Sequence, residues 1–514
     1  MVWHIYRNLA LAAVISAVSM TGFAEPLTVK TVAGRVHGKL IDHDTVRAFQ
    51  GIPYAAPPVG DLRWKAPQPA AKWQVQLDAT HYGHHCAQNH VFDDMIFQDS
   101  GPSEDCLTLN IYTPAEASSK LPVMFWIHGG GYSGGGSSEP RHNGDFLPGK
   151  GVVLVTFNYR LGVFGFLATP DLAAEQGGTA GNYALMDMVA ALQWVKKNIA
   201  AFGGDPNNVT IFGESAGSRA VSTLMAVPSA RGLFAKAIGE SGSALLLNGV
   251  LPLQPLSVRG PEDAAWVKEL GANSLAELRA MPTDQILAAA AKRGVTGFAP
   301  VVDGKFLTET VAETFAAGRQ AHVPLLAGFN HDEAFYYANG MTAAKWKATG
   351  EQQYPDKAEE FFKLYPGATD DEAIRSASDY GGDQRIAFAT WKWMEWHRKT
   401  GNSVVYRYKM DLAAPPSKFH PESKVFHSDD IEYVFGTLDT RPGSTWRPED
   451  RKLSEQMMSY WTNFAKTGDP NGPDLPEWPK YGQGDPVLHL DNPITSRPDE
   501  NRARYDFWTA NEKK

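Results

Sequence analysis

The sequence predicts an α/β fold in which helices flank a large, mostly parallel sheet. Near-continuous apolar runs, typical of strands that are buried on both faces, occupy residues 107–114, 121–131 and 151–160. Apolar residues then recur at helical spacing over residues 180–202, Gly203 and Gly204 end that helix, and an apolar strand follows at 209–213. Strand, helix and strand in this order imply a parallel sheet with right-handed crossovers.

The remaining segments fit the same class. Residues 28–40 and 45–55, which glycine and proline interrupt, predict a small antiparallel sheet near the N-terminus. The weaker alternation that follows predicts strands at 234–240, 323–329 and 403–410, and helices near 261–291, 309–317, 383–399 and 451–466. No repeat, low-complexity tract or linker divides the chain, so we expect residues 25–514 to form one domain.

The composition is that of a globular protein with a large core, because 43% of the residues are hydrophobic, 11% aromatic and 20% charged. The net charge is −9, and the chain has no run of Lys or Arg that would follow a phosphate backbone. We therefore expect no nucleic-acid partner.

The first 24 residues have the layout of a secretory signal. His4 and Arg7 precede an apolar run over residues 9–20, and small residues follow up to Ala24. The apolar run is too short to span a bilayer, although an uncleaved membrane anchor is the alternative. We expect a mature chain that begins near Glu25, is secreted or periplasmic, and has no membrane span.

The chain contains two cysteines, Cys86 and Cys106. An even number of cysteines in an exported protein favours a disulfide that closes the loop between them. Two buried free thiols are the alternative.

Two glycine motifs point to a nucleophilic serine. GESAG (213–217) matches the strand-to-helix turn in which glycines flank the serine because the turn is too tight for a Cβ. An apolar strand precedes this motif and a helix follows it, as the turn requires. Upstream, HGGG (128–131) follows a predicted strand and would let backbone N–H groups converge on a tetrahedral intermediate. A flexible glycine turn is the alternative for HGGG.

Long collinear motifs carry a family resemblance over residues 27–510. They are FQGIPYAAPPVGDLRW, SEDCLTLNIYTP, HGGGYSGG, NYRLGVFGFL, the stretch 181–217 that ends in GESAG, FAPVVDG, HDEAFYY and HSDDIEYVFG. In these motifs the chain resembles the type-B carboxylesterases, which are cholinesterase-like α/β-hydrolases with bacterial, para-nitrobenzyl-esterase-like members. The resemblance implies an α/β-hydrolase fold, one catalytic domain and hydrolysis of carboxylic esters.

The resemblance also implies the catalytic groups. Ser215 is the expected nucleophile, His427 of HSDDIEYVFG the base and Glu333 of HDEAFYY the acid, in the chain order of this fold. The implied oxyanion donors are the backbone N–H groups of Gly130, Gly131 and Ala216. Such a mechanism needs no metal ion and no organic cofactor.

Neighbouring carboxylates leave alternatives open. Asp332 is adjacent to Glu333 and is a rival for the acid. Asp429 and Asp430 follow His427 closely, and we expect them to be solvated or helix-capping residues.

Similarity further implies structural features without a catalytic role. Arg63 would form an ion pair with Glu104 at the base of the cysteine loop. Asn208-Val209-Thr210 matches a glycosylation acceptor, but it lies where the chain enters a core strand, so we expect no glycan there.

The cysteine loop argues against choline esters. Cholinesterases hold a quaternary ammonium on a tryptophan in this loop by cation–π attraction. Residues 87–105 contain no tryptophan, and Ile96 stands at about the corresponding place.

Other positions implied to line the pocket favour a roomier acyl side. Residues 294–297 stand ahead of Phe298 where cholinesterases carry aromatics, which predicts that acyl groups larger than acetyl fit near Thr296 and Phe298. Tyr336 and Tyr337 match gorge-wall aromatics of the family, and ordinary packing aromatics are the alternative.

Arg219 departs from the family pattern, which has a small or apolar residue at this position. An unpaired guanidinium is costly to bury, so three interpretations are open. Arg219 pairs with Glu214 or Glu240, binds a substrate carboxylate as a bidentate fork, or extends to solvent.

The sequence as a whole predicts a secreted serine carboxylesterase that acts on small-molecule esters as a monomer. A lipase is the nearest alternative, although no long amphipathic lid segment stands out, and a preference for amides or thioesters stays open. From a different class, the alternative is a catalytically silent cholinesterase-like binding or adhesion module. Such modules lose a triad member, whereas all three positions are present here.

Overall fold

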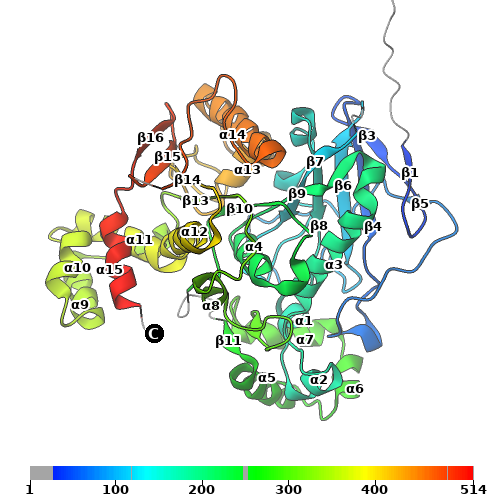
Figure 1. Cartoon of the computed structure of the whole chain (residues 1–514). Helices are drawn as coiled ribbons and strands as arrows, with labels where there is room; N and C mark the ends of the chain where they lie inside the picture. The colour runs from blue at the N-terminus through cyan, green and yellow to red at the C-terminus, as the bar shows by residue number, and fades with distance from the viewer. Residues whose placement is uncertain (1–26, 117–118, 247–252, 483, 513–514) are drawn as a thin grey trace, which may run out of the picture.

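The computed structural model describes residues 27–116, 119–246, 253–482 and 484–512. Among these residues, eleven strands form one sheet in the order β16-β15-β14-β13-β10-β9-β7-β8-β6-β4-β3 (Figure 1). The run from β15 to β8 is parallel, and antiparallel pairs complete both edges. The strands are β3 (Lys39–Ile41), β4 (Val46–Pro53), β6 (Thr108–Pro114), β7 (Leu121–Ile127), β8 (Val153–Phe157), β9 (Gly204–Glu214), β10 (Lys236–Glu240), β13 (Leu325–Asn330), β14 (Val405–Met410), β15 (Pro486–Leu490) and β16 (Thr495–Pro498).

The small N-terminal sheet is present, with one difference from the prediction. β1 (Thr28–Lys30) and β2 (Arg35–His37) pair antiparallel, and β5 (Leu77–Asp78) joins β2 in parallel. The second predicted run, residues 45–55, instead supplies β4 to the edge of the main sheet, because its residues pair with β6. A further pair is formed by β11 (Gln254–Pro255) and β12 (Val301–Val302).

The helices confirm the predicted α/β class. They are α1 (Gly162–Phe166), α2 (Pro170–Glu175), α3 (Tyr183–Asn198), α4 (Ala216–Ala226), α5 (Leu256–Glu269), α6 (Leu275–Ala280), α7 (Thr283–Ala290), α8 (Val311–Ala316), α9 (Ala343–Gln353), α10 (Ala358–Leu364), α11 (Asp370–Gly382), α12 (Phe388–Gly401), α13 (Asp430–Phe435), α14 (Pro448–Thr467) and α15 (Arg502–Asn511). A π-helical turn, Asp383–Ala387, joins α11 to α12. The stretch predicted at 261–291 is three helices, because Gly271 adopts a left-handed conformation and Pro282 precedes α7.

Alternate residues of the central strands face two separate hydrophobic cores. On β7, Val123, Phe125 and Ile127 belong to the core shared with α3 and α4, whereas Met124 and Trp126 belong to the core shared with α13 and α14. Figure 1 shows β10 and β13 between α13 and α14 above and α4 and α12 below. The strands are therefore buried on both faces, as the apolar runs predict.

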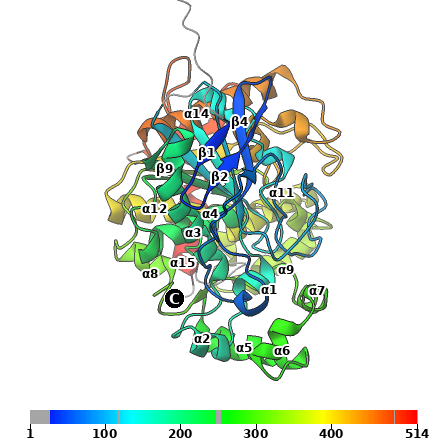
Figure 2. The same ribbon diagram turned by 90° about the vertical axis from the view of Figure 1, so that its right-hand side faces the viewer.

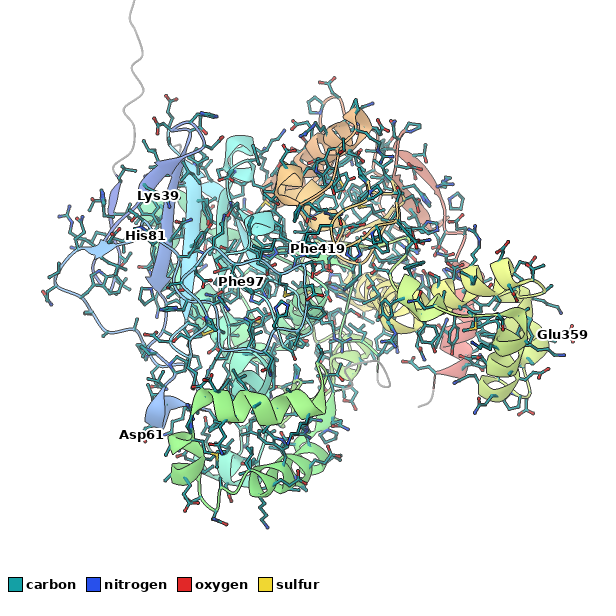
Figure 3. The ribbon with its side chains drawn as sticks, turned by 180° about the vertical axis from the view of Figure 1, so that it is seen from behind. Lys39, Asp61, His81, Phe97, Glu359 and Phe419 are labelled. Atoms are coloured by element: carbon teal, nitrogen blue, oxygen red, sulfur yellow. A yellow bond between two sulfur atoms is a disulfide. The ribbon has the colours of Figure 1, made fainter. Side chains whose placement is uncertain are left out.

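Two groups of helices extend beyond these layers. Figures 1 and 2 show α2, α5, α6 and α7 together at the end of the molecule farthest from α14. Helices α9, α10, α11 and α15 surround a smaller core that includes Trp346, Phe361 and Tyr380. Glu359 of α10 lies at the outer edge of this group (Figure 3).

Buried ion pairs and the disulfide fix the loops that follow the strands. Cys86 and Cys106 form the expected disulfide. Beside it, Nε of Arg63 donates to Oε2 of Glu104 over 2.7 Å, as the resemblance implies. The guanidinium of Arg160, just after β8, donates to both carboxylate oxygens of Asp187 on α3 at 2.7 and 2.8 Å.

Three further expectations from the sequence concern the secretory signal, a membrane span and the glycosylation motif at Asn208. The secretory signal expected at residues 1–24 lies outside the described residues. None of the helices in the described ranges has the length and apolar character that a membrane crossing requires. The amide of Asn208 accepts from the ammonium group of Lys236 and donates to the carbonyl oxygen of Lys466, so it is engaged within the protein.

The turn from β9 to α4 depends on a very close approach of two backbones. A Cβ on Gly217 would lie 1.9 Å from the carbonyl oxygen of Ile127, and a Cβ on Gly213 would lie 2.6 Å from the same atom. These distances give a physical reason for both glycines of the GESAG motif. The end of β7 therefore touches the first turn of α4.

We predict that Gly217→Ala destabilises the protein by about 2–3 kcal/mol, because β7 or α4 must shift to accommodate the methyl group. Urea unfolding checks this. Gly260→Ala is the matched control, since Gly260 is also helical but its Cβ would meet no atom closer than 3.6 Å. Equal unfolding midpoints for the two variants would contradict the prediction.

Candidate active site

Ser215 occupies a strained backbone conformation between β9 and α4. Its φ is 55° and its ψ is −117°, which non-glycine residues rarely adopt. The backbone N–H of Ser215 donates to the carbonyl oxygen of Glu240 at 2.9 Å. The carbonyl oxygen of Ser215 accepts the backbone N–H of Arg219 at 2.9 Å. These bonds hold the strain, and such strain in a rigid setting points to a functional residue.

His427 lies between Ser215 and Glu333. Its Nε2 is 2.8 Å from Oγ of Ser215, and its Nδ1 is 2.5 Å from Oε2 of Glu333. The other oxygen of Glu333 accepts the N–H of Asn330 at 2.7 Å, which fixes the carboxylate on the loop after β13. The structure thus brings the three predicted catalytic residues into one hydrogen-bonded chain.

Asp332, the rival for the acid, has a different role. Its carboxylate accepts the N–H of Val425 at 3.0 Å, and its own N–H donates to the carbonyl oxygen of Val425 at 3.0 Å. Asp332 therefore ties the loop of Glu333 to the segment that precedes His427.

The glycine loop lies directly against Ser215. A Cβ on Gly129 would lie 3.2 Å from the Cβ of Ser215 and 2.5 Å from Oε2 of Glu214. Tyr159 holds the start of this loop, since its hydroxyl donates to the carbonyl oxygen of His128 at 2.6 Å. Gly130 and Gly131 have φ values of 95° and 62°, so both need the freedom of glycine.

The predicted oxyanion donors are free to bind a ligand. Within the described part of the chain, no acceptor takes the backbone N–H groups of Gly130, Gly131 or Ala216. Ala216 is the first residue of α4, where the helix leaves its N–H groups unsatisfied. This arrangement suits stabilisation of negative charge beside Ser215.

Glu214 is a second carboxylate next to His427, a role that the sequence motifs do not predict. Its Oε1 is 3.3 Å from Nε2 of His427 and accepts the hydroxyl of Ser428 at 2.6 Å. Burial lowers the pKa of His427, but the carboxylates of Glu214 and Glu333 raise it more, so this pKa lies above its usual value.

From the sequence, Asp429 and Asp430 are expected to be solvated or helix-capping residues. Asp429 does stand at the N-cap position of α13, but neither residue is solvated, because both carboxylates are buried. Asp430 accepts the hydroxyl of Tyr408 at 2.9 Å, and burial together with nearby carboxylates raises its pKa to about 7. Asp429 accepts the N–H of Phe426 at 2.8 Å and pairs with Arg441 at 2.7 Å. Asp430 also accepts the side-chain amide of Asn330 at 3.3 Å, so groups from other segments enclose both acidic residues.

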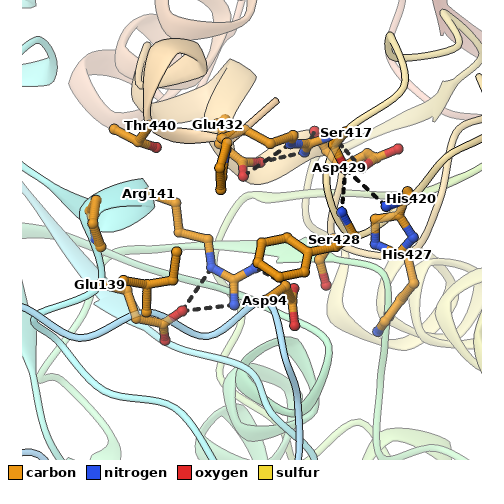
Figure 4. A pocket seen from close by; sticks show the side chains of 15 residues that line it. Asp94, Glu139, Arg141, Ser417, His420, His427, Ser428, Asp429, Glu432 and Thr440 are labelled. Atoms are coloured by element: carbon orange, nitrogen blue, oxygen red, sulfur yellow. Dashed lines mark hydrogen bonds and ion pairs between the residues drawn. The ribbon is translucent and has the colours of Figure 1, made fainter. Parts of the chain in front are cut away.

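A pocket opens beside His427 and Ser428 (Figure 4). Its apolar lining includes Ile96, which is 42% exposed, and Phe419, which lies near the centre of the molecule in Figure 3. Its charged lining consists of two arginines with their carboxylates, namely Arg141 with Asp94 and Glu139, and Arg441 with Asp429 and Glu432. Both arginines are therefore neutralised within the wall.

The structure gives the predicted acyl-side residues distinct positions. Thr296 is exposed, and Phe298 is buried against Trp266 with the guanidinium of Arg293 4.7 Å from its ring centre. Val295 approaches the glycine loop instead. A Cβ on Gly131 would lie 2.9 Å from Cγ1 of Val295, and the carbonyl oxygen of Val295 accepts from Ser133.

Tyr336 and Tyr337 differ in exposure. Tyr336 is 57% exposed, whereas Tyr337 is half-buried and packs against Tyr380 with ring centres 6.4 Å apart. The packing alternative therefore describes Tyr337 better than Tyr336.

Arg219 is 8% exposed, which does not fit the interpretation that it extends to solvent. Its expected carboxylate partners have other contacts. Glu214 bonds Ser428, and Oε1 of Glu240 accepts the indole N–H of Trp461 at 2.7 Å. Burial lowers the pKa of Arg219, and Tyr132 opposes this effect.

Comparison with known proteins agrees with this geometry. The model of the carboxylesterase family matches residues 25–508. Para-nitrobenzyl esterase of Bacillus subtilis (strain 168) is 35% identical, over 94% of this chain and 98% of its own. Fumonisin B1 esterase of Sphingopyxis macrogoltabida is 34% identical, over 91% of this chain and 86% of its own.

Solved structures give the same result. A PNB esterase structure superposes with a TM-score of 0.81 at 33% identity, over 93% of this chain and 99% of its own. The chain therefore belongs to the carboxylesterase family, has the α/β-hydrolase fold, and is a carboxylic ester hydrolase.

Proposed function

We propose that the protein hydrolyses small-molecule esters through a Ser215-His427-Glu333 triad and an acyl-enzyme intermediate. The observation that carries this proposal is the position of His427, 2.8 Å from the hydroxyl oxygen of Ser215 and 2.5 Å from the carboxylate of Glu333. A catalytically silent binding module is not favoured, because it would have no need of a strained serine that is hydrogen-bonded to an imidazole.

The chemistry follows from this geometry. His427 takes the proton of Ser215 as Oγ attacks the ester carbonyl, and then gives that proton to the leaving alcohol. Glu333 orients the imidazole and stabilises its cation. The N–H groups of Gly130, Gly131 and Ala216 bind the oxyanion. Water then attacks the acyl-enzyme while His427 takes its proton, and His427 returns that proton to Oγ of Ser215 as the acid leaves.

Further predictions from the sequence are also part of this proposal. The mature protein is secreted or periplasmic, which the layout of residues 1–24 and the Cys86–Cys106 disulfide support. The acyl side accepts groups larger than acetyl, because Val295 rather than an aromatic residue faces Gly131. Thr296, Phe298, Tyr336 and Tyr337 remain candidates for the substrate-binding walls, together with Arg219.

We predict that Ser215→Ala lowers kcat for p-nitrophenyl esters by about 10⁴-fold or more, because the nucleophile of the acyl transfer is lost. Spectrophotometric release of p-nitrophenol measures this. Ser257→Ala, an exposed serine on α5, is the control and retains full turnover. Unchanged turnover in Ser215→Ala would refute the serine mechanism.

For the acyl group, we predict that kcat/KM rises from p-nitrophenyl acetate to butyrate, because each buried methylene contributes ~0.8 kcal/mol. Val295→Phe narrows the space beside Gly131 and is expected to reverse the order. A steady fall from acetate through butyrate to benzoate in the wild-type protein would show that the acyl side is narrow.

For the pH dependence, we predict that Glu214→Gln moves the acidic limb of the kcat/KM profile to lower pH, by about one unit. The Glu214 carboxylate favours the imidazolium of His427, so its removal lowers the pKa of His427. Neutral His427, the form that acts as base, then persists at lower pH. Asp94→Asn, whose carboxylate pairs with Arg141 in the wall of the pocket, is the control with an unshifted limb. A limb that stays in place or moves upward in Glu214→Gln would contradict this assignment.

A further inference from the structure

The π-helical turn Asp383–Ala387 lies beside the loop that carries Glu333 and close to the loop after β10, which contacts Ser215. Just before the turn, a Cβ on Gly382 would lie 3.5 Å from the Cβ of Glu333. Just after it, the carbonyl oxygen of Ala389 accepts the hydroxyl of Ser243 at 2.7 Å. Ser243 adjoins Gly242, whose Cβ would lie 2.6 Å from the carbonyl oxygen of Ser215. Turns of this kind are rare and frequently mark functional sites.

Arg385, in this turn, stands above the two tyrosines that follow Glu333. Its guanidinium carbon is 5.7 Å from the ring centre of Tyr336 and 5.6 Å from that of Tyr337. These cation–π contacts hold the guanidinium beside the two aromatic rings. Since Tyr336 is 57% exposed, this edge of the site is open to a ligand.

The guanidinium of Arg385 is available to an anion. Its Nε is buried without a hydrogen-bond acceptor, and throughout the described ranges no residue forms a hydrogen bond or ion pair with this side chain. Its two terminal nitrogens are not among the buried, unsatisfied atoms, so they are accessible. A half-buried arginine presents the fork that binds a carboxylate through two parallel hydrogen bonds.

Nearby arginines are satisfied within the protein. Arg504 pairs with Asp383 of the same turn over 2.9 Å, so this carboxylate does not serve Arg385. In the pocket beside His427, Arg141 and Arg441 each contact two carboxylates. Positive charge is therefore left uncompensated at Arg385, on the side of the site formed by Glu333 and the loop after β10.

We propose that Arg385 is a substrate-binding residue that selects esters carrying a free carboxylate. This inference rests on the proposed serine esterase mechanism and adds the substrate class. The carboxylate belongs to the acyl part or to the alcohol part of the ester, and in either case it is bound by the fork of Arg385 over Tyr336 and Tyr337.

Two matched ester pairs test the proposal and distinguish the two halves of the substrate. In the acyl arm, mono-p-nitrophenyl adipate is compared with the p-nitrophenyl ester of adipic monoamide. In the alcohol arm, 4-carboxyphenyl acetate is compared with 4-carbamoylphenyl acetate. In one arm at least, the wild-type enzyme is expected to prefer the carboxylate in kcat/KM by about tenfold, and added salt is expected to reduce this preference.

The variants assign the preference to Arg385. Arg385→Gln is expected to reduce the carboxylate-to-amide ratio about tenfold, through KM rather than kcat, and Arg385→Lys to reduce it less because a point charge remains. Arg375→Gln, an exposed arginine on α11, is the matched control with an unchanged ratio.

The outcomes that overturn the proposal are clear. If the wild-type enzyme has a carboxylate-to-amide ratio of kcat/KM near one in both arms, the proposal is overturned, whether or not the variants fold. The proposal is also overturned if Arg385→Gln and Arg385→Lys leave the carboxylate-to-amide ratio of kcat/KM unchanged. Equal losses for the acid and the amide would mean that Arg385 only packs against the tyrosines. Turnover that survives Ser215→Ala would refute the serine mechanism instead, so the two failures are distinguishable.

Discussion

The close approach of α4 to the end of β7 is the constraint on which the rest of the site depends. Because glycine at 217 lets the helix touch the carbonyl oxygen of Ile127, the glycine loop that continues β7 comes to lie against Ser215. The same contact forces the chain through the strained φ of Ser215, since β9 must turn into α4 without lateral space. The proposed nucleophile, the proposed oxyanion donors and Glu214 are thus placed by one backbone contact.

A second consequence of this tight packing is the accumulation of carboxylates around one imidazole. Glu214, Glu240, Glu333 and Asp430 are all buried, and burial raises the pKa of Glu214, Glu240 and Asp430. Hydrogen bonds from Ser428, Trp461, Asn330 and Tyr408 offset part of this desolvation. Neighbouring carboxylates also raise the pKa of Glu240 and of Asp430, so the ionisation of these groups is linked.

Sequence patterns located the backbone of this site but not its electrostatics. The sheet, α3 and the β9–α4 turn follow from apolar periodicity and glycine spacing, and the residues of the triad came from motifs of the family. By contrast, the enclosure of Asp429 and Asp430 depends on side chains from distant segments, namely Asn330, Tyr408 and Arg441. Likewise, loop register decides that Val295 rather than Thr296 meets Gly131, and no periodic signal reports loop register.

Arg385 illustrates the same limit and shows where specificity resides. In the sequence it is one arginine inside a predicted helix, where a solvated surface residue is the ordinary expectation. Its significance arises from a π-helical turn, from two tyrosines contributed by another segment, and from Arg504, which occupies the nearest acid. The proposed nucleophile and the glycine loop are fixed by the contact between β7 and α4, and the loops of Glu333 and His427 by the hydrogen bonds of Asn330 and Asp332. The charge that a substrate meets is set by residues outside those contacts. The positive charges of Arg141 and Arg441 are compensated by carboxylates, whereas that of Arg385 is not, within the part of the chain that the structure describes. Substitutions at Arg385 can therefore alter substrate choice without changing the geometry of the proposed triad.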